Sequence, residues 1–177
     1  MRNKIIIFGR SPFINRIDFD KIDYDNFSIC CLNTLNAKLK RIDYVVSVDD
    51  NVMFAYDREF EWISANTGWL FKETGSDYTI LEKCLSWAFF SSSAAVSFAI
   101  LRGYKEIYLA GVDLIGGRVF EHYDGKPTNV KPEDMCNAEK DFIREICGKY
   151  RVKVFTLNPD NNWINFADIG VVNNDKN

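Results

Sequence analysis

The chain has 177 residues, of which 47% are apolar and 27% charged, and it carries a formal net charge of −3. This length is sufficient for one globular domain with a substantial core. The small negative charge and the absence of a basic stripe exclude non-specific binding to nucleic acid, and no apolar run approaches the ~20 residues of a transmembrane helix. Five cysteines without metal-ligand spacing are typical of a reducing compartment, so we expect a cytoplasmic protein.

Short apolar runs in the first half of the chain predict strands separated by polar turns. We expect strands at residues 4–8, 26–32 and 43–48, and shorter ones at 68–72 and 77–81. The apolar run at 5–8 is too short for a signal peptide. Helical spacing predicts a helix over residues 51–64, with the apolar positions Val52, Met53, Tyr56, Phe60 and Ile63.

The second half begins with the run SSSAAVSFAILRG, which predicts a helix over residues 92–102 that closes at Gly103. A strand is expected at 106–110 and another at 151–157. The polar, glycine-containing loop 116–131 between them is expected to be a lid that orders when ligand binds. Pro132 then starts a helix, since proline suits the first turn. Its predicted buried stripe consists of Met135, Ala138, Phe142 and Ile146.

Apolar strands that alternate with helices predict an α/β fold. We expect a single Rossmann-like domain over residues 1–170, with a mostly parallel central sheet and helices on both faces. Residues 171–177 are expected to form a polar C-terminal tail. The sequence leaves homo-oligomerisation open.

Polar residues follow every strand expected to end at the carboxyl edge of this sheet. They are Gly9-Arg10-Ser11, Asn33-Thr34, Asp49-Asp50-Asn51, Asp113 and Asn158. Turns and helix caps use these residue types as well. Ligands of open parallel sheets bind at the carboxyl edge, however, so five such loops together favour a binding site.

The hydroxyl run Ser91-Ser92-Ser93 starts the central helix, where backbone N–H groups attract anions. Arg10 could pair with a phosphate through its planar fork, or it could be a solvated turn residue. The first loop lacks the glycine pattern of dinucleotide folds and the Gly-Lys-Ser/Thr of a P-loop. We therefore interpret this edge as a nucleotide site without a standard motif.

Two further features of this edge could carry chemistry. Asp49 and Asp50, with Asp113, could hold a divalent cation, although a helix cap also explains one acid of the pair. His122 is the only histidine and lies in the long loop, where it could take or give a proton. Tyr123 beside it is either a core aromatic or a stacking surface for a base or sugar.

Several segments in order resemble the small α/β family that includes bacterial lipooligosaccharide sialyltransferases, to which the 6-hydroxymethylpterin diphosphokinase-like group is related. The segments are 5–12 (IIIFGRSP), 30–33 (CCLN), 91–113, 150–159 (YRVKVFTLNP) and 162–166. The block at 91–113 is rather specific and the others are supportive. Residues 51–90 match poorly.

The resemblance implies roles for several residues. In the sialyltransferases the first loop and the asparagine after the second strand hold a cytidine nucleotide, which implies this role for Gly9, Arg10, Ser11 and Asn33. The start of the central helix also contacts the nucleotide, and Ser91 and Ser92 correspond to it. His122 is similar to the family's general base, and these enzymes require no metal. The chain departs from the family at Arg10 and Ser11 and in its shorter lid, so the donor sugar stays open.

The leading hypothesis is a glycosyltransferase that moves a sugar from a nucleotide-activated donor to a hydroxyl acceptor, either a small molecule or a glycan. His122 would accept the acceptor's proton, and Arg10 and the helix start would stabilise the leaving nucleotide. One alternative is a Mg²⁺-dependent diphosphokinase-like transferase that uses the acidic residues. Another is a non-catalytic module that binds and sequesters a nucleotide.

Overall fold

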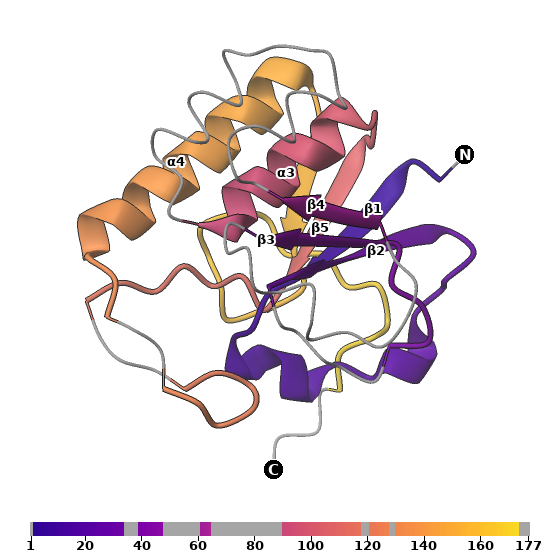
Figure 1. Ribbon diagram of the computed structural model, residues 1–177, viewed down its shortest axis with the longest axis horizontal. Helices are drawn as coiled ribbons and strands as arrows, with labels where there is room; N and C mark the ends of the chain where they lie inside the picture. Colours follow the sequence, from indigo (N-terminus) through magenta and orange to yellow (C-terminus); the bar gives the residue numbers. More distant parts are fainter. Residues whose placement is uncertain are drawn as a thin grey trace.

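The computed structural model describes residues 2–33, 39–47, 61–64, 90–117, 121–127 and 130–173. In these residues six parallel strands form one sheet in the order β4-β3-β2-β1-β5-β6 (Figure 1). The strands are β1 (Lys4–Phe8), β2 (Phe27–Leu32), β3 (Tyr44–Ser47), β4 (Glu61–Ser64), β5 (Glu106–Ala110) and β6 (Lys153–Thr156). The predicted Rossmann-like α/β fold is confirmed.

Alternate strand residues face opposite sides of the sheet, and both sides are apolar. Ile5 and Ile7 of β1 lie in the core on one side, whereas Ile6 and Phe8 lie in the core on the other. A parallel sheet covered on both faces requires such continuous apolar strands. This requirement explains why runs such as KIIIF and FSICCL were recognisable as strands within a residue or two.

The first face of the sheet is covered by two helices, α3 (Ser91–Leu101) and α4 (Glu133–Tyr150), which lie together on the same side in Figure 1. All residues from Ser91 to Ile100 are buried. The small side chains of α3 allow close contact with the sheet and with α4, and Phe98 fills the core between them.

The opposite face is covered by shorter elements. These are the 3₁₀ helices η1 (Pro12–Arg16) and η2 (Phe19–Lys21), together with the segment that follows β6. Val171 is buried and Val172 pairs with Ile17 in an antiparallel bridge. The chain therefore stays packed through at least the first residues of the segment expected to be a polar tail.

One predicted helical feature was wrong, and a second was right only in part. Glu61–Ser64, expected to end a helix, forms β4 and pairs with β3. The rest of that predicted helix, and the predicted strands at 68–72 and 77–81, lie outside the described residues. The buried stripe of α4 runs through Cys136, Glu139, Ile143, Ile146 and Cys147, while Met135, Ala138 and Phe142 flank it. Ile146 is buried as predicted, Met135, Ala138 and Phe142 are partly buried, and Phe142 packs against the core. The centre of the buried face includes an acid, so apolarity alone placed the stripe to one side of it.

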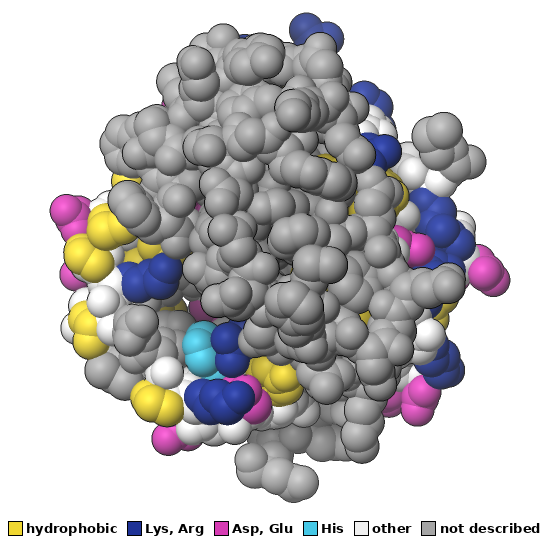
Figure 2. Space-filling model, in the orientation of Figure 1, with side chains coloured by type: hydrophobic (Ala, Val, Ile, Leu, Met, Phe, Trp, Pro, Cys, Tyr) yellow, Lys and Arg dark blue, Asp and Glu magenta, His cyan; other side chains and the backbone are white. Residues whose placement is uncertain are grey.

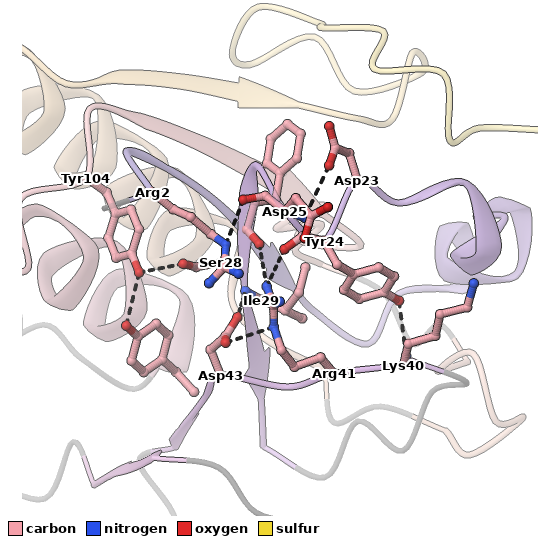
Figure 3. Close-up of polar contacts among 12 residues, drawn as sticks. Arg2, Asp23, Tyr24, Asp25, Ser28, Ile29, Lys40, Arg41, Asp43 and Tyr104 are labelled. Carbon is pink, nitrogen blue, oxygen red and sulfur yellow. Dashed lines mark hydrogen bonds and ion pairs between the residues drawn. The ribbon is translucent and has the colours of Figure 1, made fainter.

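The amino edge of the sheet is held by a network of side chains (Figure 3). Arg41 donates hydrogen bonds to the carbonyls of Tyr24 and Phe27, at 2.7 and 2.8 Å. The Asp43 carboxylate accepts the Ile29 N–H at 2.8 Å and lies 2.9 Å from Arg41 Nε. These bonds fix the start of β2 before its ladder with β3 begins, so this edge has a structural role.

Candidate functional site

The strand order creates a topological switch point at the carboxyl edge. The chain runs outward from β1 through β2, β3 and β4, then returns to β5 on the other side of β1. Phe8 is in register with both Cys31 and Ala110, so β1, β2 and β5 end at the same level. Such a switch point is where open α/β sheets bind ligands.

The loops after β1 and β5 approach each other closely because both contain glycine. Gly9 N–H donates to the Ala110 carbonyl at 2.7 Å, and Ser11 N–H donates to the Gly111 carbonyl at 3.1 Å. A Cβ at Gly9 would overlap the Gly111 carbonyl oxygen. Gly111 has φ +68°, and a Cβ there would lie 2.7 Å from the Ile14 side chain. Both positions therefore require glycine.

In the first loop, Ser11 and Arg10 have clear local contacts. The buried Ser11 hydroxyl accepts the Phe13 N–H and caps η1. Arg10 Nη2 lies 3.3 Å from Asp124 Oδ2. Within the described residues, the buried Arg10 Nε has no hydrogen-bond partner. Arg10 is thus partly neutralised but keeps a buried donor, which fits neither a fully solvated turn residue nor a saturated structural arginine.

His122 lies in a tight turn that contacts the first loop. Glu121 and Pro127 form an antiparallel bridge, and His122 N–H donates to the Lys126 carbonyl at 2.7 Å. Tyr123 N–H donates to the Arg10 carbonyl at 3.0 Å, and Asn15 donates to the Tyr123 carbonyl at 3.2 Å. The predicted site residues Arg10, His122 and Tyr123 therefore come together, although they are far apart in sequence.

The His122 ring is partly buried and lies beside charge. Its Nδ1 is 3.3 Å from the Arg10 carbonyl oxygen. Because a carbonyl only accepts hydrogen bonds, this contact favours the tautomer with the proton on Nδ1 and the lone pair on Nε2. Burial and the nearby Arg10 charge lower the pKa of His122 below its usual value. Figure 2 shows the histidine side chain at the surface, among basic and acidic side chains.

The end of β2 meets the start of α3. Asn33 follows β2 and has a left-handed conformation, with φ 53°. Its Oδ1 accepts a hydrogen bond from Ser91 Oγ at 2.7 Å. The structure therefore brings together two more predicted site residues on the other side of β1.

The start of α3 contains a buried carboxylate that the sequence analysis missed. Glu139 of α4 is 3% exposed, and its Oε1 accepts hydrogen bonds from Ser92 Oγ and Ser93 N–H, both at 2.8 Å. Burial raises the pKa of Glu139. The expectation of N–H groups open to a ligand at this helix start is therefore wrong for Ser93. The positions 136, 139, 143 and 146 have the spacing of one helix face, which indicates that Glu139 is buried but not which residues it contacts.

The acidic residues predicted for this edge have separate environments. Asp113, after β5, accepts a hydrogen bond from Asn158, which follows β6, at 3.1 Å. Asp49 and Asp50 lie outside the described residues. Among the described residues no three His, Cys, Asp or Glu side chains form a group that could hold a metal ion.

The helices in the described part of the chain include none with the length and apolarity needed to cross a membrane.

No family model and no curated protein matches the chain. Its fold is similar to that of sialyltransferases from Campylobacter jejuni. The complex of CstII with the substrate analogue CMP-3FNeuAc matches with a TM-score of 0.56 and 18% identity, covering 97% of this chain and 88% of that one. The monofunctional α-2,3-sialyltransferase Cst-I matches with 0.55 and 15%, covering 99% and 86%.

A further CST-II structure, in complex with a trisaccharide acceptor and CMP, matches with a TM-score of 0.54 and 18% identity over 93% of this chain and 86% of that chain. At such identities the similarity shows a shared fold. It supports the sialyltransferase-like part of the resemblance seen in the sequence and gives no support to the diphosphokinase-like part.

Proposed function

We propose that the protein is a glycosyltransferase that transfers a sugar from a nucleotide-activated donor to a hydroxyl group of a glycan or small-molecule acceptor. The observation that carries the proposal is the position of His122, whose ring lies against the loop after β1 at the switch point. A cytidine-linked donor is the first choice, because the similar sialyltransferase structures contain CMP or a CMP-sugar analogue.

His122 is suited to act as a general base. The contact of Nδ1 with the Arg10 carbonyl leaves the lone pair on Nε2, and a lowered pKa keeps the ring neutral at pH 7. In the proposed step Nε2 takes the proton of the acceptor hydroxyl. The acceptor oxygen bonds to the anomeric carbon, and the bond from that carbon to the phosphate oxygen breaks. The electron pair of that bond leaves with the nucleotide.

Arg10 is a cation near His122, since its carbonyl contacts the His122 ring and its charge lowers the pKa of that ring. Its guanidinium could stabilise the charge that develops on the departing phosphate, and its buried Nε offers a hydrogen-bond donor. Asn33 and Ser91 would bind the nucleoside, together with Gly9, Ser11, Ser92 and Asp113 at the same edge. We propose the same role for Asp49, which lies outside the described residues. Tyr123 would add a stacking surface. The proposed reaction requires no metal ion.

The test is release of nucleotide from a panel of sugar nucleotides that includes CMP-linked sialic acid, with and without a trisaccharide acceptor. We expect acceptor-dependent release, and a 100- to 10,000-fold lower kcat in His122→Ala, the usual range for loss of a general base. Affinity for CMP should change less than about threefold. Lys40→Ala, at an exposed ion pair on the amino edge, is the matched control and should keep full activity.

Two outcomes would contradict the proposal. Turnover of His122→Ala at the wild-type rate would remove the proposed base. Tight binding of an intact donor without product over long incubation would instead identify a module that sequesters the nucleotide.

A further inference from the structure

The start of α3 is a position that normally attracts an anion. The N-terminal N–H groups of a helix have no partner within it, and the helix dipole favours negative charge there. Phe90, the residue before α3, provides no side-chain cap. Among the described residues, the group that meets this need at Ser93 comes from another helix, namely the Glu139 carboxylate of α4.

Glu139 is fixed in place by its surroundings. One oxygen accepts both the Ser93 N–H and the Ser92 hydroxyl, and the side chain is almost fully buried. A carboxylate in such a place needs compensation, because burial disfavours its charge. The two hydrogen bonds and the charge of Lys131 act in this direction, but burial outweighs them, so the pKa of Glu139 is raised. The helix start is thus occupied by an internal carboxyl group.

The next hydroxyl along the helix faces β2. Ser91 Oγ donates to Asn33 rather than to the carboxylate. The group beside Glu139 is therefore an uncharged polar pair, which suits a ribose or a base better than a phosphate. A phosphate placed here would have to compete with the Glu139 carboxyl group for the Ser93 N–H.

The other side of β1 has the opposite charge. Arg10 follows β1 and lies beside the loop after β5, where its ion pair with Asp124 is partly solvated. Its buried Nε lacks a hydrogen-bond partner among the described residues. A phosphate oxygen is the kind of acceptor that this donor would take. At the carboxyl edge the Glu139 carboxyl group therefore lies at the start of α3, whereas Arg10, paired with Asp124, lies at the loops after β1 and β5.

We propose that Glu139 is a positioning residue of the nucleotide site, whose carboxylate fills the start of α3 and so places the ligand's phosphate at Arg10 and its nucleoside at Asn33 and Ser91. This inference rests on the proposed function, since it requires that a nucleotide binds at this edge. It assigns a role to a residue on α4 that acts through Ser92 and Ser93.

The first test measures the dissociation constant of cytidine divided by that of CMP, a ratio that isolates the contribution of the phosphate. Glu139→Gln keeps an oxygen acceptor for Ser93 N–H, so it should fold and leave the ratio within about twofold of wild type. Arg10→Gln should bring the ratio close to one. A tenfold higher ratio in Glu139→Gln, or an unchanged ratio in Arg10→Gln, would overturn the proposal, because the phosphate would then lie beside Glu139.

The second test uses inorganic phosphate alone and needs no nucleotide. Glu139→Ala leaves the Ser93 N–H without its acceptor, so millimolar phosphate should bind there and raise the melting temperature of this variant. Wild type and Glu139→Gln should show no such rise. If millimolar phosphate changes the melting temperature of all three proteins equally, the Glu139 carboxyl group does not block an anion site at the helix start. If wild type binds neither CMP nor cytidine, the proposed function fails on its own, and the phosphate response still decides whether Glu139 fills the helix start.

Discussion

The two edges of the sheet each contain an arginine next to an aspartate, and the two pairs differ in how completely they are satisfied. At the amino edge Arg41 donates to two backbone carbonyls, and its Nε lies 2.9 Å from Asp43. At the carboxyl edge Arg10 has one ion pair, at 3.3 Å, in place of these three contacts. The buried Nε of both arginines lacks a hydrogen-bond partner in the described residues, so the difference lies in the contacts of the other guanidinium nitrogens and in the shorter ion pair of Arg41. The first pair is committed to the fold, whereas the second keeps capacity for a ligand.

The number of contacts that a polar group makes therefore distinguishes structural from functional residues better than the residue type does. The Asp43 carboxylate accepts the Ile29 N–H in place of a backbone carbonyl of a neighbouring strand, so loss of Asp43 would affect folding. Asp124 lies in a turn with exposed neighbours, and its loss would mainly change the field around Arg10 and His122. Stability and binding should therefore respond separately at the two edges.

The largest effect is expected where the carboxyl edge is most tightly packed. Gly9→Ala should destabilise the protein by about 3 kcal/mol, because its Cβ would overlap the Gly111 carbonyl and force the two loops apart. Gly148→Ala, with open space around the new Cβ within α4, is the control and should be neutral or slightly stabilising. Urea unfolding of both variants measures the difference, and equal stabilities would contradict the close approach of the loops.

The second-largest effect is expected at the amino edge, on the free energy of unfolding. Asp43→Ala should lower the free energy of unfolding by about 2 kcal/mol, because it leaves the Ile29 N–H and the Arg41 guanidinium without their partner. CMP affinity of the folded protein should not change. Lys40→Ala, which breaks an exposed ion pair nearby, should cost less than about 0.5 kcal/mol. Loss of CMP binding in folded Asp43→Ala would show that the two edges are not independent.

At the carboxyl edge, Arg10→Lys should cost about 1–2 kcal/mol of CMP affinity, the scale of one charge-assisted hydrogen bond. Lysine keeps the charge but lacks the planar fork. Stability should change little, because the Asp124 pair is partly solvated. Titration calorimetry with CMP and with cytidine checks the cause. A loss seen only with CMP supports a phosphate contact, and an equal loss with both ligands points to a distorted loop.

The smallest effect concerns His122 and pH. Its lowered pKa means that the unfolded chain binds the proton more readily than the native protein. The stability that comes from the neutral ring is present above about pH 6.5 and is lost as the pH falls through the lowered pKa. Between pH 8 and pH 5 wild type should lose more stability than His122→Gln. An equal or smaller loss would contradict the burial of a neutral ring.

Much of the fold was predictable because buried parallel strands are nearly continuous apolar runs. The strands β1, β2 and β5 were located from Ile, Val, Phe and Cys runs within one residue of their bounds. The strand β4 was not, since the sequence EWIS is short and its apolar residues also fit a helical repeat. Period alone does not separate a short strand from a helix end.

The contacts of the site were only partly predictable. Strand ends identified Gly9, Arg10, Asn33 and Asp113, because the carboxyl edge of a parallel sheet collects the residues that follow each strand. Glu139 was missed, because its role depends on the packing of α4 against the start of α3. Such a contact between residues 46 positions apart leaves no local signal at Ser93.

The central claim is that a nucleotide binds at the carboxyl edge, around the ends of β1, β2 and β5. Amide chemical shifts of ¹⁵N-labelled protein, followed during titration with CMP, test it directly. We expect saturable changes at residues 9–11, 33 and 111–113, with the amides of residues 24–29 and 41–43 at the amino edge unaffected. Changes confined to the amino edge, or no saturable change at residues 9–11 and 111–113, would contradict it.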